Sequence, residues 1–292
     1  MNSPGRPKSE HRHAQHESTP ITRTLWIDGV ALWSPALPGW AVAQAAFKGE
    51  AVELPPDTPR RPAPALLAAN ERRRAPDSVL LALEAASQAL ADSGLEAAAV
   101  ASVFSSAHGD LAVTDALCKT LAADPTLLSP TRFHHAVHNA ASGYWAIGSG
   151  SHAASTALSA FETSFAAGLL EAASQCAADA QPVLLVAYDT EAVGALASVN
   201  RSRGLLAVAL LLSPAPGPRS RWVLDWALQP GAAAVPALQS AAAQALADNA
   251  SAPALPLLEA MAVSRSATLA WPLSSTLLLH VQLRPLTGPN GH

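Results

Sequence analysis

Three histidines and an asparagine form the densest group of side chains in this sequence that could do acid–base or metal chemistry. His134, His135, His138 and Asn139 lie within six consecutive positions. Imidazole titrates near neutral pH and often binds metals, so the group raises the hypotheses of a general base and of a metal site. No acid, thiol or hydroxyl motif stands at a fixed helical offset from it, and such residues often hydrogen-bond loop backbone. We therefore predict no metal or cofactor, and keep His138 and Asn139 as candidate pocket or interface residues.

A second pair of candidate residues, His108 and Asp110, directly follows an apolar run. Residues 98–106 are rich in Val and Ala and end in small polar side chains. That pattern is typical of a buried parallel strand whose C-terminal end meets a functional surface. We expect His108 and Asp110 to lie on such a surface.

The apolar pattern of the chain predicts the elements that position these residues. Apolar runs of strand length alternate with segments of helical periodicity, which indicates a doubly wound α/β fold. A helix after Pro76 is expected to stop at Gly94. The predicted strands cover 25–33, 98–106, 182–189, 204–213, 221–229 and 275–283, and the other predicted helices cover 113–121, 161–172 and 235–246.

Composition limits the classes of function. Only 14% of the residues are charged and the formal net charge is −4, so the basic surface that nucleic acid requires is missing. The low charge and the many alanines indicate either a large surface buried against another subunit or the codon usage of a GC-rich genome. Arg72, Arg73 and Arg74 could dock an acidic carrier protein, although a solvated loop is the more common reason for such a run.

Location and domain limits follow from similar observations. The first residues have no signal-peptide core, and no apolar run is a clear membrane span, because Ser, Pro, Arg or Gly interrupts each one. Cys118 and Cys176 form no CxxC pair, which fits a reducing cytoplasm. We expect a cytoplasmic protein. Its expected parts are a tail at 1–20, a main domain at 21–214, a C-terminal α/β segment at 215–285 and a second tail at 286–292.

Three segments together carry a resemblance to a known family. They read SVFSSAHGDL, LSPTRFHHAVHNAASGYWAI and STALSAFETSFAAGLLEA. The chain thereby resembles β-ketoacyl synthase-like proteins over residues 25–214, and in particular the cysteine-less, chain-length-factor-type subunits of aryl-polyene and fatty-acid-like biosynthetic clusters. The resemblance implies an α/β thiolase-like half-fold, with a mixed, mostly parallel sheet flanked by helices and a reduced C-terminal segment.

The resemblance also implies the site. In this family a TAC-type turn between a short strand and a buried helix carries the cysteine that takes the acyl chain. Here the turn would comprise Thr156, Ala157 and Leu158, with Leu158 in the place of the cysteine and the helix starting at Phe161. A thiolate at a helix N-terminus is activated by the backbone N–H groups, whereas leucine has nothing to ionise. Leu158 would thus be a degenerate nucleophile position, with Thr156 and Phe161 as further pocket or interface residues.

The function implied by the resemblance is that of a non-catalytic partner. Such subunits form a heterodimer with an active ketosynthase that elongates chains held by an acyl carrier protein. Pairing would use residues 136–155, next to the turn. The two histidines, the lysine and the glycine-rich turn of the family's second half find no match in this sequence.

Two other functions remain open at this stage. One is an acyl-transferring or condensing enzyme that uses Ser159 or Ser155. A residue one place after the nucleophile position on a helix points about 100° away from it, and a serine also needs a positioned base, which the sequence does not offer. GSGSH at 148–152 is no hydrolase elbow, because it ends in His152. The other is a stand-alone scaffold that kept half of the fold.

Overall fold

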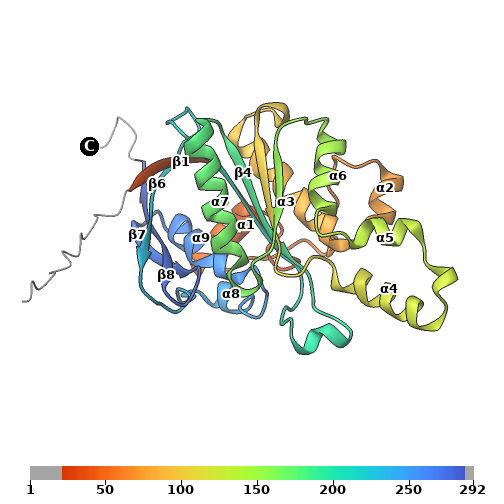
Figure 1. Cartoon of the computed structure of the whole chain (residues 1–292). Helices are drawn as coiled ribbons and strands as arrows, with labels where there is room; N and C mark the ends of the chain where they lie inside the picture. The colour runs from red at the N-terminus through yellow and green to blue at the C-terminus, as the bar shows by residue number, and fades with distance from the viewer. Residues whose placement is uncertain (1–21, 287–292) are drawn as a thin grey trace, which may run out of the picture.

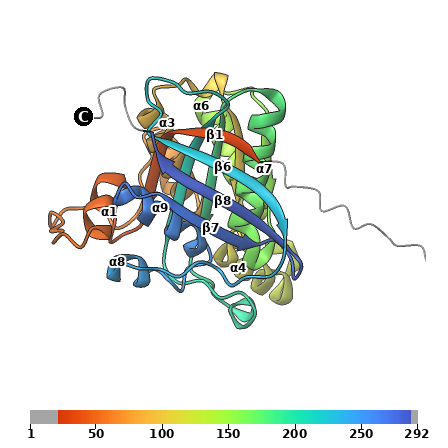
Figure 2. The same ribbon diagram turned by 90° about the vertical axis from the view of Figure 1, so that its left-hand side faces the viewer.

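A single eight-stranded sheet organises the computed structural model, which describes residues 22–286 (Figures 1 and 2). The strand order is β3-β2-β4-β5-β1-β6-β8-β7. The expected tail at 1–20 lies outside the described residues, as does that at 286–292 except for residue 286. The strands are β1 Arg23–Trp33, β2 Ala101–Ser105, β3 Ser155–Leu158, β4 Val183–Asp189, β5 Leu206–Ser213, β6 Trp222–Pro230, β7 Ala267–Pro272 and β8 Leu277–Pro285.

The helices lie on both faces of this sheet and at one end of it. The α-helices are α1 Trp40–Phe47, α2 Ala69–Arg74, α3 Asp77–Ser93, α4 Leu111–Ala123, α5 Pro130–Ala136, α6 Ala140–Ser149, α7 Ser164–Asp179, α8 Ala241–Gln244 and α9 Leu255–Ala262. Short 3-10 helices are Ala97–Ala99, Pro125–Leu127, Phe161–Thr163, Ala195–Ser198 and Ala252–Ala254. Figure 1 shows α4, α5 and α6 together at the end of the molecule opposite β7.

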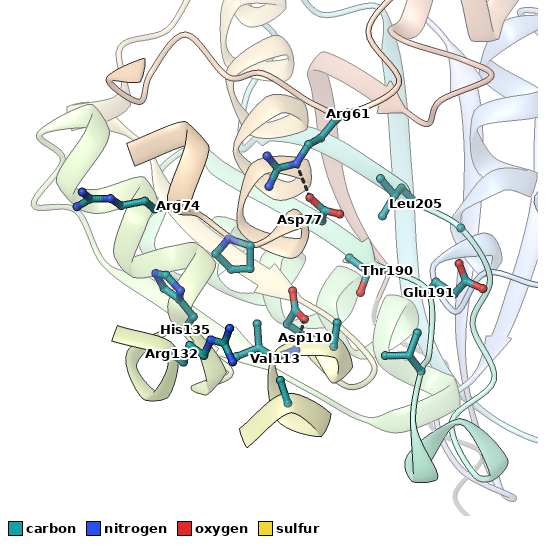
Figure 3. Close-up of a pocket in the computed structure, with 15 residues that line it drawn as sticks. Arg61, Arg74, Asp77, Asp110, Val113, Arg132, His135, Thr190, Glu191 and Leu205 are labelled. Carbon is teal, nitrogen blue, oxygen red and sulfur yellow. Dashed lines mark hydrogen bonds and ion pairs between the residues drawn. The ribbon is translucent and has the colours of Figure 1, made fainter. Parts of the chain in front are cut away.

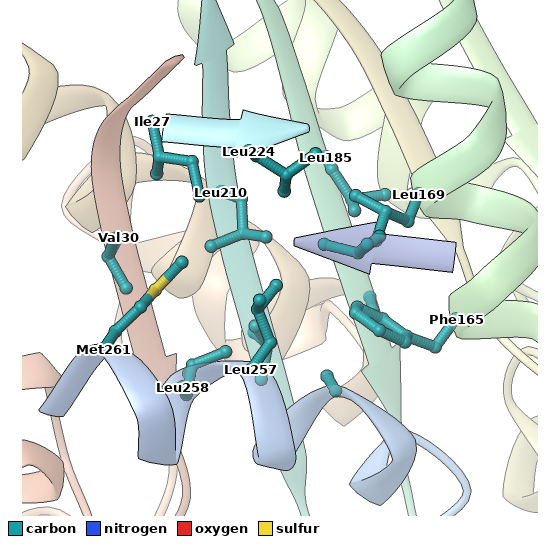
Figure 4. Close-up of a cluster of buried hydrophobic side chains, with 14 of the residues drawn as sticks. Ile27, Val30, Phe165, Leu169, Leu185, Leu210, Leu224, Leu257, Leu258 and Met261 are labelled. Atoms are coloured by element: carbon teal, nitrogen blue, oxygen red, sulfur yellow. The ribbon is translucent and has the colours of Figure 1, made fainter. Parts of the chain in front are cut away.

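Burial of the central strands on both faces explains their apolar sequences. Every residue of β4 and β5 is buried. Successive strand residues point to opposite faces, so Leu184 joins the cluster under α3 while Leu185 joins the cluster under α7 and α9. Figure 4 shows the cluster under α7 and α9, where Phe165 points in from α7 and Leu257 from α9. Both helix layers are therefore held by the same two strands.

The sheet is mixed and flanked by helices, as expected, but the prediction that it is mostly parallel is wrong. Among the strands of residues 22–286, only β2 pairs in parallel, with β3 and with β4. All other neighbouring strands are antiparallel. The reason is that β5 enters between β4 and β1 and opposes both, while a short turn links β7 to β8 and permits only antiparallel pairing.

The C-terminal segment continues the same sheet. Strand β6 pairs with β1 over five residues, and β8 and β7 follow it. All residues of α9 are buried, and its apolar side chains belong to the cluster that also contains residues of α7. The division of the chain at residue 214 stays a prediction.

Close packing of α7 on β2 yields a test of this architecture. A Cβ atom added at Gly168 would lie 2.7 Å from Cβ of Ser105, whereas one added at Gly143, also helical, would meet nothing within 4 Å. We expect Gly168→Ala to lower the free energy of unfolding by about 1–3 kcal/mol through overpacking. The matched Gly143→Ala change should raise it by about 0.5–1 kcal/mol, because alanine favours the helix. Urea denaturation measures both, and equal effects would contradict this packing.

Candidate functional site

A sharp turn between β3 and α7 is the most unusual backbone feature near the predicted site. Phe161 has a φ of 52°, in the left-handed region, and its side chain is 49% exposed. The Ser164 hydroxyl donates to the Phe161 carbonyl and accepts from the Ala160 N–H, which braces the turn. For a residue other than glycine this backbone costs on the order of 1 kcal/mol. Strained turns from a strand into a helix are used in enzymes to present a nucleophile.

The structure places this turn later than the sequence-based prediction did. Thr156, Ala157 and Leu158 lie within β3, where Leu158 pairs with Ser105 and is partly buried. Thr156 accepts a hydrogen bond from the Gln175 side chain at 3.0 Å. The residue at the tip of the turn is Phe161, three positions after Leu158. Like leucine, phenylalanine has no group that could take an acyl chain.

The serines near the turn are engaged with other groups. The Ser159 hydroxyl donates to the Ala107 carbonyl at 2.8 Å. The Ser155 hydroxyl accepts from the Ser102 hydroxyl at 2.9 Å. Neither serine contacts a histidine or carboxylate within the described residues, so neither has the base that a serine nucleophile needs.

A buried carboxylate lies behind the turn and joins three segments. Asp189, 1% exposed, accepts hydrogen bonds from the Ser106 hydroxyl, the Ala107 N–H and the Ser251 hydroxyl at 2.8–2.9 Å. Burial raises the pKa of this carboxyl, while nearby His108 and the three donors oppose the shift. Nε2 of His108 lies 3.9 Å from Asp189 and has no hydrogen-bond partner among residues 22–286. The hydrogen bonds of Asp189 therefore tie the ends of β2 and β4 to the segment before α9.

The predicted histidines and acids have structural contacts in the described chain. His138 donates through Nε2 to the Ser106 carbonyl at 3.1 Å. Asp110 caps α4 by accepting from the Val113 N–H at 2.9 Å. Asn139 is exposed and precedes α6. Its carbonyl accepts hydrogen bonds from the Ser142 hydroxyl and the Gly143 N–H in the first turn of that helix. His108, Asp110 and His138 thus come together around one loop after β2, and their role as pocket or interface residues stays a prediction.

His134 and His135 lie on α5, a helix outside the helical ranges predicted from the sequence. Ser129 and Pro130 begin α5 as cap and first residue. His135 is buried and its Nε2 lies 2.9 Å from the Tyr144 hydroxyl. Burial and the neighbouring His134 lower its pKa. Among residues 22–286 no group of three potential ligands is placed to hold a metal ion.

One cavity brings candidate residues together with residues that the sequence did not single out. It has a volume of about 520 Å³, and His108 and Phe161 line it. Asn249 and Val235 complete it from the C-terminal segment, and Arg201 from the loop after β4. Long-range placement of this kind leaves no local pattern in a sequence. A cavity of this volume can enclose a ligand, and Phe161 at the turn offers no group that could bind it covalently.

Comparisons with known proteins agree on one family and one fold. Residues 45–275 match the family described as beta-ketoacyl synthase, N-terminal domain. No curated protein matches the chain. In the part of the chain that the structure describes, no helix has the length and apolar character needed to cross a membrane.

Several solved structures share the fold at low sequence identity. A chain of a ketosynthase in complex with its chain length factor from Xenorhabdus doucetiae is 22% identical, with a TM-score of 0.67 over 89% of this chain and 99% of that one. The ishigamide ketosynthase/chain length factor is 17% identical, with a TM-score of 0.67 over 90% and 100%. A type II polyketide synthase acyl-carrier protein in complex with its ketosynthase is 10% identical, with a TM-score of 0.69 over 91% and 100%.

The buried carboxylate predicts a pH dependence of stability. A carboxyl whose pKa is raised on folding favours the folded state at low pH, and this contribution is lost as the pH rises through the folded pKa. Asp189→Asn keeps one oxygen for Ser106 and Ala107, and lets its amide donate to Ser251. We expect the unfolding free energy of this variant, relative to wild type, to increase with pH above about 4, by at most about 1.4 kcal/mol per pH unit. Urea denaturation from acid to neutral pH measures the difference, and a decrease with pH would contradict the raised pKa.

Proposed function

The chain belongs to the β-ketoacyl synthase N-terminal domain family, and on that premise we propose that it is a non-catalytic subunit of chain-length-factor type. It would pair with an active ketosynthase in acyl-carrier-protein-dependent, fatty-acid-like or aryl-polyene biosynthesis. The observation that carries the proposal is a strand-to-helix turn kept in its strained form, with Phe161 where a nucleophile would stand. We assign Phe161 rather than Leu158 to that position, because the turn lies there.

The free edge of β3 supports pairing with another protein. Strand β3 ends the sheet, and its only partner among the described strands is β2. The carbonyls of Ala154 and Leu158 accept from the N–H groups of Ser102 in β2 and of Ser106 just after it. Because backbone groups alternate along a strand, those of Ser155 and Ala157 point to the open edge. An exposed edge of this kind is a template for a strand of a partner.

Exposed apolar side chains on and just before α6, the helix that contacts β3, support the same surface. Ile147 on α6 is 79% exposed, and Val137 just before α6 is 41% exposed. Both fall in the range 136–155 that the resemblance assigned to pairing. Apolar residues gathered on a surface often mark an interface. The low charge of the chain agrees with a surface that is buried against a partner subunit.

We extend the partners from the similar structures and infer the location from the cysteines. Ketosynthase, chain length factor and acyl carrier protein are named for the similar structures, and we propose the same assembly for this chain. The free thiols of exposed Cys118 and buried Cys176 fit the cytoplasm as its location. Burial raises the pKa of Cys176 to about 12, so this thiol is inert. The alternative of a serine-based enzyme has less support, since Ser159 bonds backbone; a stand-alone scaffold remains the outcome if pairing fails.

Pairing can be tested by changes at the edge that spare the fold. Ala157→Pro removes an outward N–H, and Ile147→Asp places a charge on the apolar surface. We expect each to raise the dissociation constant for the coexpressed ketosynthase at least about tenfold, or about 1.4 kcal/mol. Affinity pull-down followed by calorimetry measures the effect.

The control for this experiment is Val263→Asp. Val263 is 45% exposed and follows α9, on the other side of the molecule from α6 (Figure 1). This variant should pair like wild type. If all three variants pair normally, or if the wild-type chain never recovers a ketosynthase, the proposed role is wrong.

Catalysis by the complex provides a second test. Ser159→Ala should leave the elongation rate within about twofold of wild type, because the acyl chain is held by the partner. Omission of this subunit should change the product length or the activity. Loss of elongation on Ser159→Ala, with Leu158→Ala unaffected, would instead establish the serine enzyme.

A further inference from the structure

Three large apolar side chains are exposed on the segment from α4 to α5, which comprises residues 111–136 and is called the α4–α5 segment below. Leu121 on α4 is 53% exposed, Leu127 in the 3-10 helix that follows is 70% exposed, and Phe133 on α5 is 65% exposed. All three fall within residues 121–133, so they are grouped around the turn between the two helices. Apolar side chains gathered in this way often mark an interface.

The α4–α5 segment packs little against the rest of this chain. Leu111 is the only buried residue of α4, and His135 is the only buried residue of α5. A cavity of about 630 Å³ lies between these helices, the N-terminus of α3 and the loops after β4 and before β5 (Figure 3). Arg132 lines that cavity, whereas none of the three exposed apolar side chains does. Those side chains are therefore not needed to hold the segment on the body of the molecule.

The charges of the α4–α5 segment balance and are partly used within it. Asp115 and Lys119 pair with each other at 2.7 Å. Asp124 caps the 3-10 helix by accepting from the Thr126 N–H at 2.9 Å. Arg132 is the one other charged residue at 111–136 when histidine is neutral. The surface that covers this segment should accordingly be apolar rather than strongly charged.

The size of a stable interface indicates which protein covers the segment. Each partner of a stable complex contributes about 800 Å² and about 20–30 residues. Strand β3 supplies four residues. Five residues within 136–155, which the proposed pairing uses, are buried inside this chain, namely Ala140, Ala141, Ser142, Trp145 and Ser151. A pairing surface limited to β3 and residues 136–155 is therefore too small and must extend to neighbouring residues.

The α4–α5 segment is the continuation that the structure offers. Helix α5 leads directly into α6 and contacts it, and Nε2 of His135 lies 2.9 Å from the Tyr144 hydroxyl on α6. We propose that this segment is a second part of the ketosynthase interface, in which Leu121, Leu127 and Phe133 pack on an apolar surface of that partner. This inference rests on the proposed function and adds a contact that pairing through β3 does not itself imply. Phe133 should contribute most, because aromatic side chains are enriched in the buried cores of interfaces.

Substitutions at the three side chains test the surface. We expect Phe133→Ala to raise the dissociation constant for the ketosynthase at least about tenfold, and Leu127→Ala at least about fivefold. Leu228→Ala is the matched control, because Leu228 is 40% exposed on β6, at the other end of the molecule from α4 and α5 (Figure 1). It should bind like wild type. Calorimetric titration measures the affinities, and urea denaturation checks that the free variants are folded.

Cys118 reports on the same surface without any substitution. It is exposed on α4, three positions before Leu121 and therefore on the same face of that helix. Cys176 is buried and its pKa is raised to about 12, so it does not compete for a thiol reagent. We expect N-ethylmaleimide to alkylate Cys118 at least about fivefold more slowly in the complex than in the free chain. Mass spectrometry of the α4 peptide measures the rate.

The outcomes separate this inference from the proposed function. The inference alone is wrong if the wild-type chain binds the ketosynthase but Phe133→Ala binds as tightly as Leu228→Ala, or if Cys118 reacts equally fast in the complex and in the free chain. It is also wrong if the chain alone forms a dimer that Phe133→Ala dissociates, since a second copy would then cover the segment. If the wild-type chain never binds a ketosynthase, the proposed function fails and this inference fails with it.

Discussion

A single buried carboxylate determines how the loops of this protein are arranged. Asp189 ends β4 and accepts hydrogen bonds from the loop after β2 and from the segment before α9. Asn249 adds bonds to the carbonyls of Asp189, Arg203 and Gly204. An unpaired buried carboxylate would be strongly destabilising, so these segments cannot separate without cost. Both cavities open on loops that this network holds in place.

The parts of the fold that the sequence predicted are those with strong local signals. The strands β4 and β5 were predicted because burial on both faces requires continuous apolar sequence. Helix α3 was predicted to stop at Gly94, which has the left-handed φ of 72° that ends a helix. The turn was misplaced because β3 has only four residues, too few for a periodic pattern. Its partner β2 defines it through long-range pairing alone.

The site was only partly predictable for the same reason. His108 and Asp110 were singled out from the residues after an apolar run, and His138 from a group of histidines. In the structure the three lie around one loop. The cavity at Phe161 and the cavity with Arg132 draw residues from segments far apart in the chain. The inference that the position of the family's cysteine carries no nucleophile does not depend on exact placement, since neither Leu158 nor Phe161 can form an acyl intermediate. That conclusion needs only the residue types around the turn.

Pairing through the β3 edge is the central claim, and hydrogen–deuterium exchange measures it most directly. Peptides that cover β3 and α6 should exchange more slowly when the chain is mixed with its ketosynthase, because outward N–H groups of β3 would then be bonded or covered. Peptides of β7, at the other edge of the sheet, should not change. Unchanged exchange in β3 and α6, in a mixture that contains the complex, would contradict the account.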